Sequence, residues 1–166
     1  MENFIYKILK KELKNDCTKI FLCVGTNNCV GDSLGPIVGD ILTQKINSNN
    51  IYIVGNSNKN LNSKNFNQNI EKIKNEIYNP FFIIIDSALA NKDVIGKVII
   101  NNNSMIIGSA LNKKHELIGN LCIKGVVGEN KENSVENFFY LNSVPKAMVE
   151  NLSYKIANSI LKALEV

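Results

Sequence analysis

Two aspartates stand where parallel-sheet proteins commonly carry catalytic carboxylates. Asp32 lies in the loop GTNNCVGDS, which follows an apolar run, and Asp86 comes directly after the apolar run FFIII. In an open α/β sheet, ligands bind beyond the carboxyl ends of the strands, because loops and helix N-termini converge there. If the two runs form neighbouring strands, the carboxylates lie within two strand spacings, ~10 Å, and face one cleft.

Such a pair of carboxylates suits hydrolysis by acid and base catalysis. Two like charges held close together cannot both form cheaply, so the pair shares one proton and provides an acid and a base at the same pH. A water molecule between them could then be activated against a peptide carbonyl. The spacing therefore suits hydrolysis by acid and base catalysis, with a peptide carbonyl as one target that such a pair could attack.

Each aspartate also has a structural alternative. Asp32 precedes a predicted helix with Pro36 in its first turn, and aspartate is a favoured N-cap residue. Asp86 could be a turn residue at the end of a strand, although a carboxylate directly after five large apolar residues is costly to bury without a partner. On spacing alone these structural roles stay open, and an N-cap role for Asp32 is compatible with catalysis.

Other catalytic arrangements find less support. His115, the one histidine, lies in the lysine-rich turn NKKHEL and is interpreted as an exposed bystander. Ser33, Ser87 and Ser109 lie near the predicted cleft, but a Ser-His-Asp triad would have to recruit His115, and there is no GxSxG elbow. The glycine-bearing loop 25–31 lacks both a GKS or GKT ending and a GxGxxG pattern, which argues against nucleotide binding.

The cysteines and the charges exclude further classes. No two cysteines form a CxxC pair, so we expect reduced side chains rather than a disulfide or metal site. The formal net charge is +4 and every basic residue is lysine. Because arginine supplies bidentate contacts to phosphates and bases, the absence of arginine and tryptophan argues against a nucleic-acid partner. The four cysteines are Cys17, Cys23, Cys29 and Cys122.

The chain of 166 residues, 45% of them hydrophobic, predicts a single domain over residues 1–166. Apolar residues at helical spacing, mixed with lysines and glutamates, predict a lead-in helix within residues 1–16. This mixed segment fits neither a signal peptide nor a membrane span. We therefore expect a cytoplasmic protein with no membrane partner.

The elements that would position the aspartates follow a βαβαβ order. Apolar runs predict strands at 19–24, 51–54 and 81–85, and helical periodicity predicts intervening helices that begin near residues 34 and 70. Later β-branched runs predict strands at 96–100, 105–107 and 117–127, and a last helix opens at Ser143 and Pro145. The predicted fold is an α/β three-layer sandwich: a twisted, mainly parallel sheet with helices on both faces and some antiparallel strands in the second half.

Three motifs resemble those of the YyaC-like sporulation proteins. They are GTNNCVGDSLGP, FFIIIDSALA, and IGSALNKKHELIG followed by a strand that ends KGVV. The resemblance runs from about Lys19 to the C-terminal helix. This family is related to the spore germination protease and, more distantly, to the hydrogenase-maturation proteases, so the resemblance also implies an α/β sandwich around a mostly parallel sheet.

The resemblance implies roles for both aspartates. In the germination protease, which degrades small acid-soluble spore proteins, the matching motifs read PDALGP and IDALAA, and their aspartates are regarded as catalytic. By position these are Asp32 and Asp86. In the hydrogenase-maturation branch the same positions are similar to metal ligands that a histidine completes. His115 stands in a loop where relatives generally lack histidine, so neither a metal nor another cofactor is predicted.

The expected function is that of an aspartate-dependent endopeptidase of sporulation or germination, which cleaves small spore proteins or another sporulation polypeptide. Such a protein would act in the cytoplasm of the forespore or mother cell. The alternatives are a non-catalytic sporulation or binding module that keeps the cleft, and a metal-dependent maturation-type peptidase. The expected partner is a protein or peptide substrate, and a homo-oligomer is left open. The predicted substrate-binding residues are Asn27, Ser33, Ser87, Gly108, Ser109 and Lys113.

Overall fold

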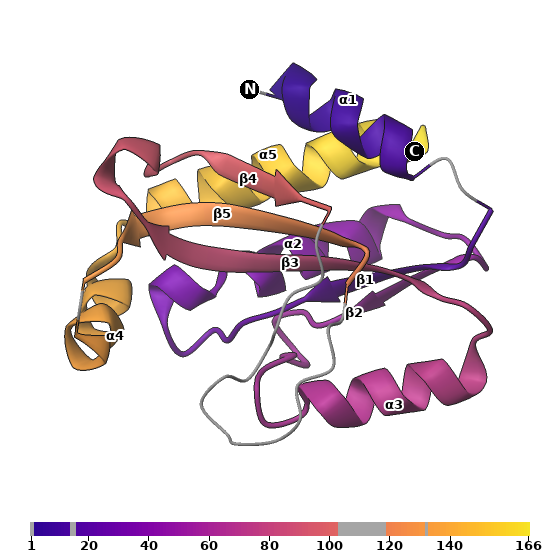
Figure 1. Cartoon of the computed structure of the whole chain (residues 1–166), viewed down its shortest axis with the longest axis horizontal. Coiled ribbons are helices and arrows are strands. Elements are labelled where there is room, and N and C mark those ends of the chain that lie inside the picture. The colour runs from indigo at the N-terminus through magenta and orange to yellow at the C-terminus, as the bar shows by residue number, and fades with distance from the viewer. Residues whose placement is uncertain (1, 14–15, 103–118, 132) are drawn as a thin grey trace.

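The computed structural model of the chain describes residues 2–13, 16–102, 119–131 and 133–166. Its helices and strands alternate through the first half of the chain (Figure 1). The elements are α1 (Glu2–Glu12), β1 (Lys19–Cys23), the 3₁₀ turn η1 (Val30–Asp32), α2 (Leu34–Lys45), β2 (Ile51–Val54), α3 (Phe66–Glu76), β3 (Phe81–Ala90), the 3₁₀ turn η2 (Lys92–Val94), β4 (Val98–Asn101), β5 (Leu121–Glu129), α4 (Ser134–Ser143) and α5 (Lys146–Leu164).

The strands form one five-stranded sheet in the order β2-β1-β3-β5-β4. β1 runs parallel to both β2 and β3, and β3 runs parallel to β5. β4 pairs with β5 in the antiparallel direction. The predicted fold class, a mainly parallel sheet with an antiparallel strand in the second half, is confirmed.

Helices cover both faces of the sheet, and each face has its own apolar core. α3 packs on one face through Phe66 and Ile70, which join the even-numbered residues of β1 and β3 in one buried cluster. α1, α2 and α5 pack on the other face, against the odd-numbered residues of the same strands. Figure 1 shows α1 and α5 above the sheet and α3 below it. Strands buried on both faces must be apolar at successive positions, which explains the runs KIFLC and FFIII.

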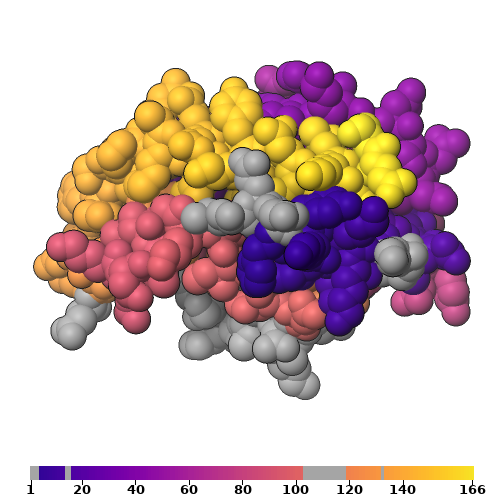
Figure 2. Space-filling model, turned by 90° about the horizontal axis from the view of Figure 1, so that it is seen from above, coloured from indigo at the N-terminus to yellow at the C-terminus, as the bar shows by residue number. Residues whose placement is uncertain are grey.

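α1 is part of the main core. Its Ile5 and Leu9 are completely buried, and Leu13, just beyond it, is nearly so. These side chains contact the cluster that α5 builds with Ile156 and Ile160. Figure 2 shows α1 and α5 side by side on the upper face of the molecule. No helix in the described ranges has the length and apolarity needed to cross a lipid bilayer.

The structure changes several predicted boundaries. β3 continues to Ala90, so Asp86 lies inside the strand rather than after its end. The predicted strand 117–127 is observed as β5 from Leu121 to Glu129, and the predicted strand 105–107 falls outside the described residues. α4 was not predicted, because no residue of this helix is buried and its apolar positions do not mark a core-facing stripe.

α2 closely approaches the backbone that follows β1 and β2. A Cβ atom on Gly35 would lie 2.0 Å from the carbonyl oxygen of Val24, and one on Gly39 would lie 1.9 Å from that of Gly55. Only glycine leaves room for this approach of helix backbone to strand backbone. The contact holds the first turn of α2, and η1 before it, over the carboxyl end of β1.

Candidate active site

Asp32 is the last residue of η1, between β1 and α2. Its backbone carbonyl accepts a hydrogen bond of 3.0 Å from the N–H of Thr26, which closes the loop. The residue that caps α2 is Ser33, whose hydroxyl donates to the carbonyl of Val30 at 2.7 Å and makes no capping bond. The structural alternative of Asp32 as an N-cap is therefore wrong, because the helix starts one residue later and Ser33 occupies that position.

The carboxylate of Asp32 is partly buried and has two donors close by. They are the backbone N–H of Thr26 and the hydroxyl of Ser87. Burial raises the pKa of Asp32 to about 6, and both donors oppose that rise because they stabilise the ionised form. A carboxylate with a pKa in this range changes charge close to neutral pH.

Asp86 lies on the face of β3 that packs against α3. Along β3, Ile84 belongs to the α3 core and Ile85 to the opposite core, so alternation places Asp86 on the α3 face and Ser87 on the α2 face. Burial first, and then the negative charge of Asp32, raise the pKa of Asp86 to about 7. The backbone N–H of Ser87 and the ammonium of Lys124 act in the opposite direction.

The end of β1 explains how residues on two faces of β3 reach one site. The last β1 residue, Cys23, pairs with Ile85, and β3 then continues without β1 beside it. Beyond this point no described strand pairs with this edge of β3, so groups on its two faces can approach each other around the edge. Asp32 approaches from the α2 side, where it meets Ser87, and its charge reaches Asp86 on the other side. The structure thus brings both predicted aspartates to the carboxyl end of β1.

The other predicted site residues differ in their positions. Asn27 is exposed, and its amide donates to the carbonyl of Ser57 at 2.7 Å, which ties the loop after β1 to the loop after β2. Ser33 faces back toward η1 through its bond to Val30. The predicted residues Gly108, Ser109 and Lys113, and also His115, lie outside the described residues.

Lys124 is a charged residue of this region that was not predicted from the sequence as a site residue. It lies directly opposite Asp86 in the ladder between β3 and β5 and is partly buried. Directly opposed residues in adjacent strands point to the same face, so both side chains lie on the α3 face. A signal was present in the sequence, because Lys124 is the one charged residue within the apolar run LCIKGVVG.

The described residues do not make up a metal centre. Within them, no three His, Cys, Asp or Glu side chains gather at one point. The two aspartates alone supply two ligands, both with raised pKa values, and the cation of Lys124 adjoins Asp86. Cys122 lies nearby on β5, but it is almost fully buried and burial raises the pKa of its thiol to about 11. Its thiol is therefore a core group and not a nucleophile.

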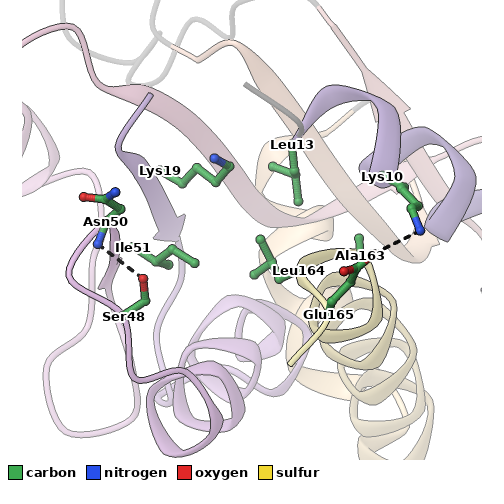
Figure 3. A pocket seen from close by; sticks show the side chains of 9 residues that line it. All are labelled: Lys10, Leu13, Lys19, Ser48, Asn50, Ile51, Ala163, Leu164 and Glu165. Carbon is green, nitrogen blue, oxygen red and sulfur yellow. Dashed lines mark hydrogen bonds and ion pairs between the residues drawn. The ribbon is translucent and has the colours of Figure 1, made fainter. Parts of the chain in front are cut away.

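A separate cavity of about 370 Å³ opens at the opposite end of the sheet (Figure 3). Lys19 and Ile51, the first residues of β1 and β2, line it together with the ends of α1 and α5. Its cation Lys10 is paired with Glu165 at 3.1 Å. The described residues that line this cavity include one carboxylate, that of Glu165, so the candidate pair of acid and base lies instead at the carboxyl ends of the strands.

The solved structures that resemble this chain include hydrogenase-maturation enzymes. The [NiFe] hydrogenase maturation protease HycI from Thermococcus kodakarensis KOD1 superposes with a TM-score of 0.65 at 14% identity, over 96% of this chain and 99% of that one. The hydrogenase maturating endopeptidase HybD from E. coli gives a TM-score of 0.49 at 14% identity, over 89% and 91%. The likeness to HycI shows that the two chains share a fold.

Two comparisons of sequence agree with the motif-based resemblance. The uncharacterized protein YyaC of Bacillus subtilis (strain 168) is 28% identical over 158 residues, which span 94% of this chain and 75% of YyaC. The predicted relation to YyaC-like proteins is thereby confirmed. Residues 1–161 match the family model described as "Protein of unknown function (DUF1256)", and the chain belongs to that family.

Proposed function

We propose that this protein is an aspartate-dependent endopeptidase in which Asp32 and Asp86 share the work of base and acid. The observation that carries the proposal is a pair of partly buried carboxylates at the carboxyl end of β1, with pKa values of about 6 and about 7, in which the charge of Asp32 helps to raise the pKa of Asp86. Two such groups near neutral pH provide one ionised and one protonated carboxyl at the same time. The fold shared with a maturation protease is in accord with a peptide substrate.

The different surroundings of the two carboxyl groups suggest their roles. Asp32 has the lower pKa and two hydrogen-bond donors, so it is the ionised member and the base. Asp86 has the higher pKa and carries the proton. Because the pair is coupled, the two values describe the pair as it titrates and the roles follow the order of ionisation.

Hydrolysis then proceeds in two balanced steps. Asp32 takes a proton from water as the water oxygen bonds to the peptide carbonyl carbon, and Asp86 gives its proton to the carbonyl oxygen. The tetrahedral intermediate collapses when the C–N bond breaks. Asp32 passes its proton to the leaving nitrogen, and Asp86 recovers a proton from the hydroxyl that becomes the new carboxylic acid. The pair returns to its starting state.

The finer part of the proposal concerns sporulation. The motif resemblance to YyaC-like sporulation proteins, and through them to the germination protease, supports a substrate among small acid-soluble spore proteins or another sporulation polypeptide. The place of action would be the cytoplasm of the forespore or mother cell. Asn27, Ser33, Ser87, Gly108, Ser109 and Lys113 are proposed to contact that substrate.

The test is cleavage of purified spore proteins, followed by mass spectrometry of the products. Wild-type protein should yield defined fragments, and Asp32→Asn and Asp86→Asn should each lose at least about 10²-fold in rate. Asp93→Asn, which alters an exposed carboxylate in η2, is the matched control and should cleave like wild type. Equal cleavage by wild type and Asp86→Asn would sink the proposal.

A further inference from the structure

We infer that Lys124 is a third catalytic residue, whose ammonium binds the oxygen that becomes negatively charged when a peptide carbonyl is attacked. This inference rests on the proposed peptidase function and adds to it the group that stabilises the tetrahedral intermediate. It comes from the position of Lys124 in the sheet, from its lack of an ion-pair partner among the described residues, and from the part of the α3 face on which it lies.

The position follows from the register of the parallel ladder. Asp86 pairs with Lys124, and their Cβ atoms are therefore about 5 Å apart on one face of the sheet. The preceding residue on that face of β5, Cys122, is in the α3 core, and Ile123 is in the opposite core. The lysine stem thus leaves β5 beside Asp86 and on the same side.

Within the described part of the chain, no partner occupies the ammonium of Lys124. It forms neither a salt bridge nor a hydrogen bond with any of the described residues, and its interaction with Asp86 acts through charge without direct contact. On its other side the β4 residue opposite Lys124 is Ile99, which carries no charge. A partly buried cation without a paired anion has a strong tendency to bind a negatively charged group.

The α3 face is not covered at this level by the helix. The α3 core ends at Ile84 on β3 and Cys122 on β5, and each of these residues exposes at most 1% of its surface. Asp86 and Lys124, the next residues on the same face, are both partly exposed. A substrate that reaches Asp86 from this side therefore meets Lys124 as well.

The chemistry of the proposed reaction creates the negative charge that Lys124 would bind. Attack of water on the carbonyl shifts an electron pair to its oxygen before that oxygen is fully protonated by Asp86. A cation held beside the acid stabilises this charge, as donors in an oxyanion hole do. Lysine provides a point charge on a flexible stem, so its ammonium can follow the oxygen through the step.

Steady-state kinetics with a cleaved peptide test the inference directly. Lys124→Met should lower kcat about 10²-fold with little change in KM, because the contact forms only in the transition state. Lys124→Arg should recover part of kcat, and added ethylamine should partly rescue Lys124→Ala. Lys97→Met removes an exposed lysine directly before β4 and is the matched control, expected to behave like wild type.

A second measurement does not need turnover. A phosphinate pseudo-dipeptide, whose PO₂⁻ group mimics the tetrahedral intermediate, should bind wild type and Lys97→Met and bind Lys124→Met at least tenfold more weakly in calorimetry. If wild type cleaves peptides and Lys124→Met has normal kcat, or if the phosphinate binds both equally or not at all, the inference is overturned. If binding depends on Lys124 but no peptide is cleaved, the anion site stands and the proposed peptidase function fails.

Discussion

The hydroxyl of Ser87 lies within hydrogen-bonding reach of the carboxylate of Asp32, although the two residues come from different sequence motifs. Ser87 directly follows Asp86 in β3, so this contact joins the loop after β1 to the strand that carries the second aspartate. The side chains of Asp86 and Ser87 alternate along β3, so the two carboxyl groups lie on either side of this strand. The charge of Asp32 raises the pKa of Asp86 at this point, and the effect can be measured.

Replacing Ser87 by alanine should raise the pKa of Asp32. The serine hydroxyl stabilises the ionised carboxylate, so its loss favours the protonated form. Carbon-13 NMR titration of the aspartate carboxyl groups measures the change. Ser63→Ala, at an exposed position in the loop before α3, is the control and should leave the titration of Asp32 as in wild type. An unchanged pKa in Ser87→Ala would show that the hydroxyl does not interact with Asp32.

Replacing Asp86 by asparagine should change how stability depends on pH. The folded-state pKa is raised from 3.8 to about 7, so the folded chain binds this proton more tightly than the unfolded chain. The stabilisation that comes from binding this proton is complete below pH about 4 and is lost as pH rises to about 7. Asp86→Asn should therefore match wild type at pH 4 and exceed it at pH 8 by roughly 2 kcal/mol in free energy of unfolding, a value reduced for partial exposure.

Urea unfolding at pH 4, 6 and 8 measures this difference. Asp93→Asn, at an exposed position, should show a constant difference from wild type across the same range. A gain from Asp86→Asn that is equal at pH 4 and pH 8 would contradict an ionisation effect.

The rate of peptide cleavage should have a narrow bell-shaped dependence on pH. Activity requires Asp32 ionised and Asp86 protonated, so the acid limb falls near pH 6 and the alkaline limb near pH 7. Lys124→Met should move the alkaline limb to higher pH, because the ammonium lowers the pKa of Asp86. Profiles of kcat/KM for wild type, Lys124→Met and Lys97→Met check this, and an alkaline limb that stays in place would be against it.

Gly35→Ala should destabilise the protein far more than Gly96→Ala. The added Cβ on Gly35 would lie 2.0 Å from the backbone oxygen of Val24, and neither backbone can move without displacing α2 from β1. We expect a loss of about 3 kcal/mol. Gly96 has a φ of +79° but nothing within 4 Å of the added atom, so only conformational strain of about 1 kcal/mol arises. Chemical unfolding compares the two, and equal losses would contradict the close approach.

Leu9→Ala should show that α1 belongs to the core. Leu9 is completely buried against the cluster that contains Ile156 and Ile160 of α5, and its truncation leaves a cavity there. The expected loss is about 3 kcal/mol in free energy of unfolding. Lys7→Ala, at an exposed position on the same helix, serves as the control and should cost much less. A loss as small as that of the control would mean that α1 packs loosely.

The fold could be predicted where apolar residues follow one another or recur at helical spacing. β1 and β3 are buried on both faces, so successive residues of each strand must be apolar and the strand is visible as a continuous apolar run. α4 was not predicted, because none of its residues is buried. Its Phe138 and Phe139 are more than 60% exposed, so its apolar residues do not mark a face turned toward the core.

The sequence by itself determined which residues carry the candidate chemistry and roughly where they stand. Asp32 and Asp86 follow or interrupt apolar runs, and this local pattern together with the motif resemblance selected them. It could not tell whether Asp32 capped the helix, since that depends on a boundary of one residue at Ser33.

Only the tertiary structure decided how these residues meet. β1 ends opposite Ile85 while β3 continues, and around this edge of β3 the charge of Asp32 raises the pKa of Asp86. The pairing of β3 with β5 sets Lys124 beside Asp86. Strand order and register join segments that are distant along the chain, and no local periodicity encodes them.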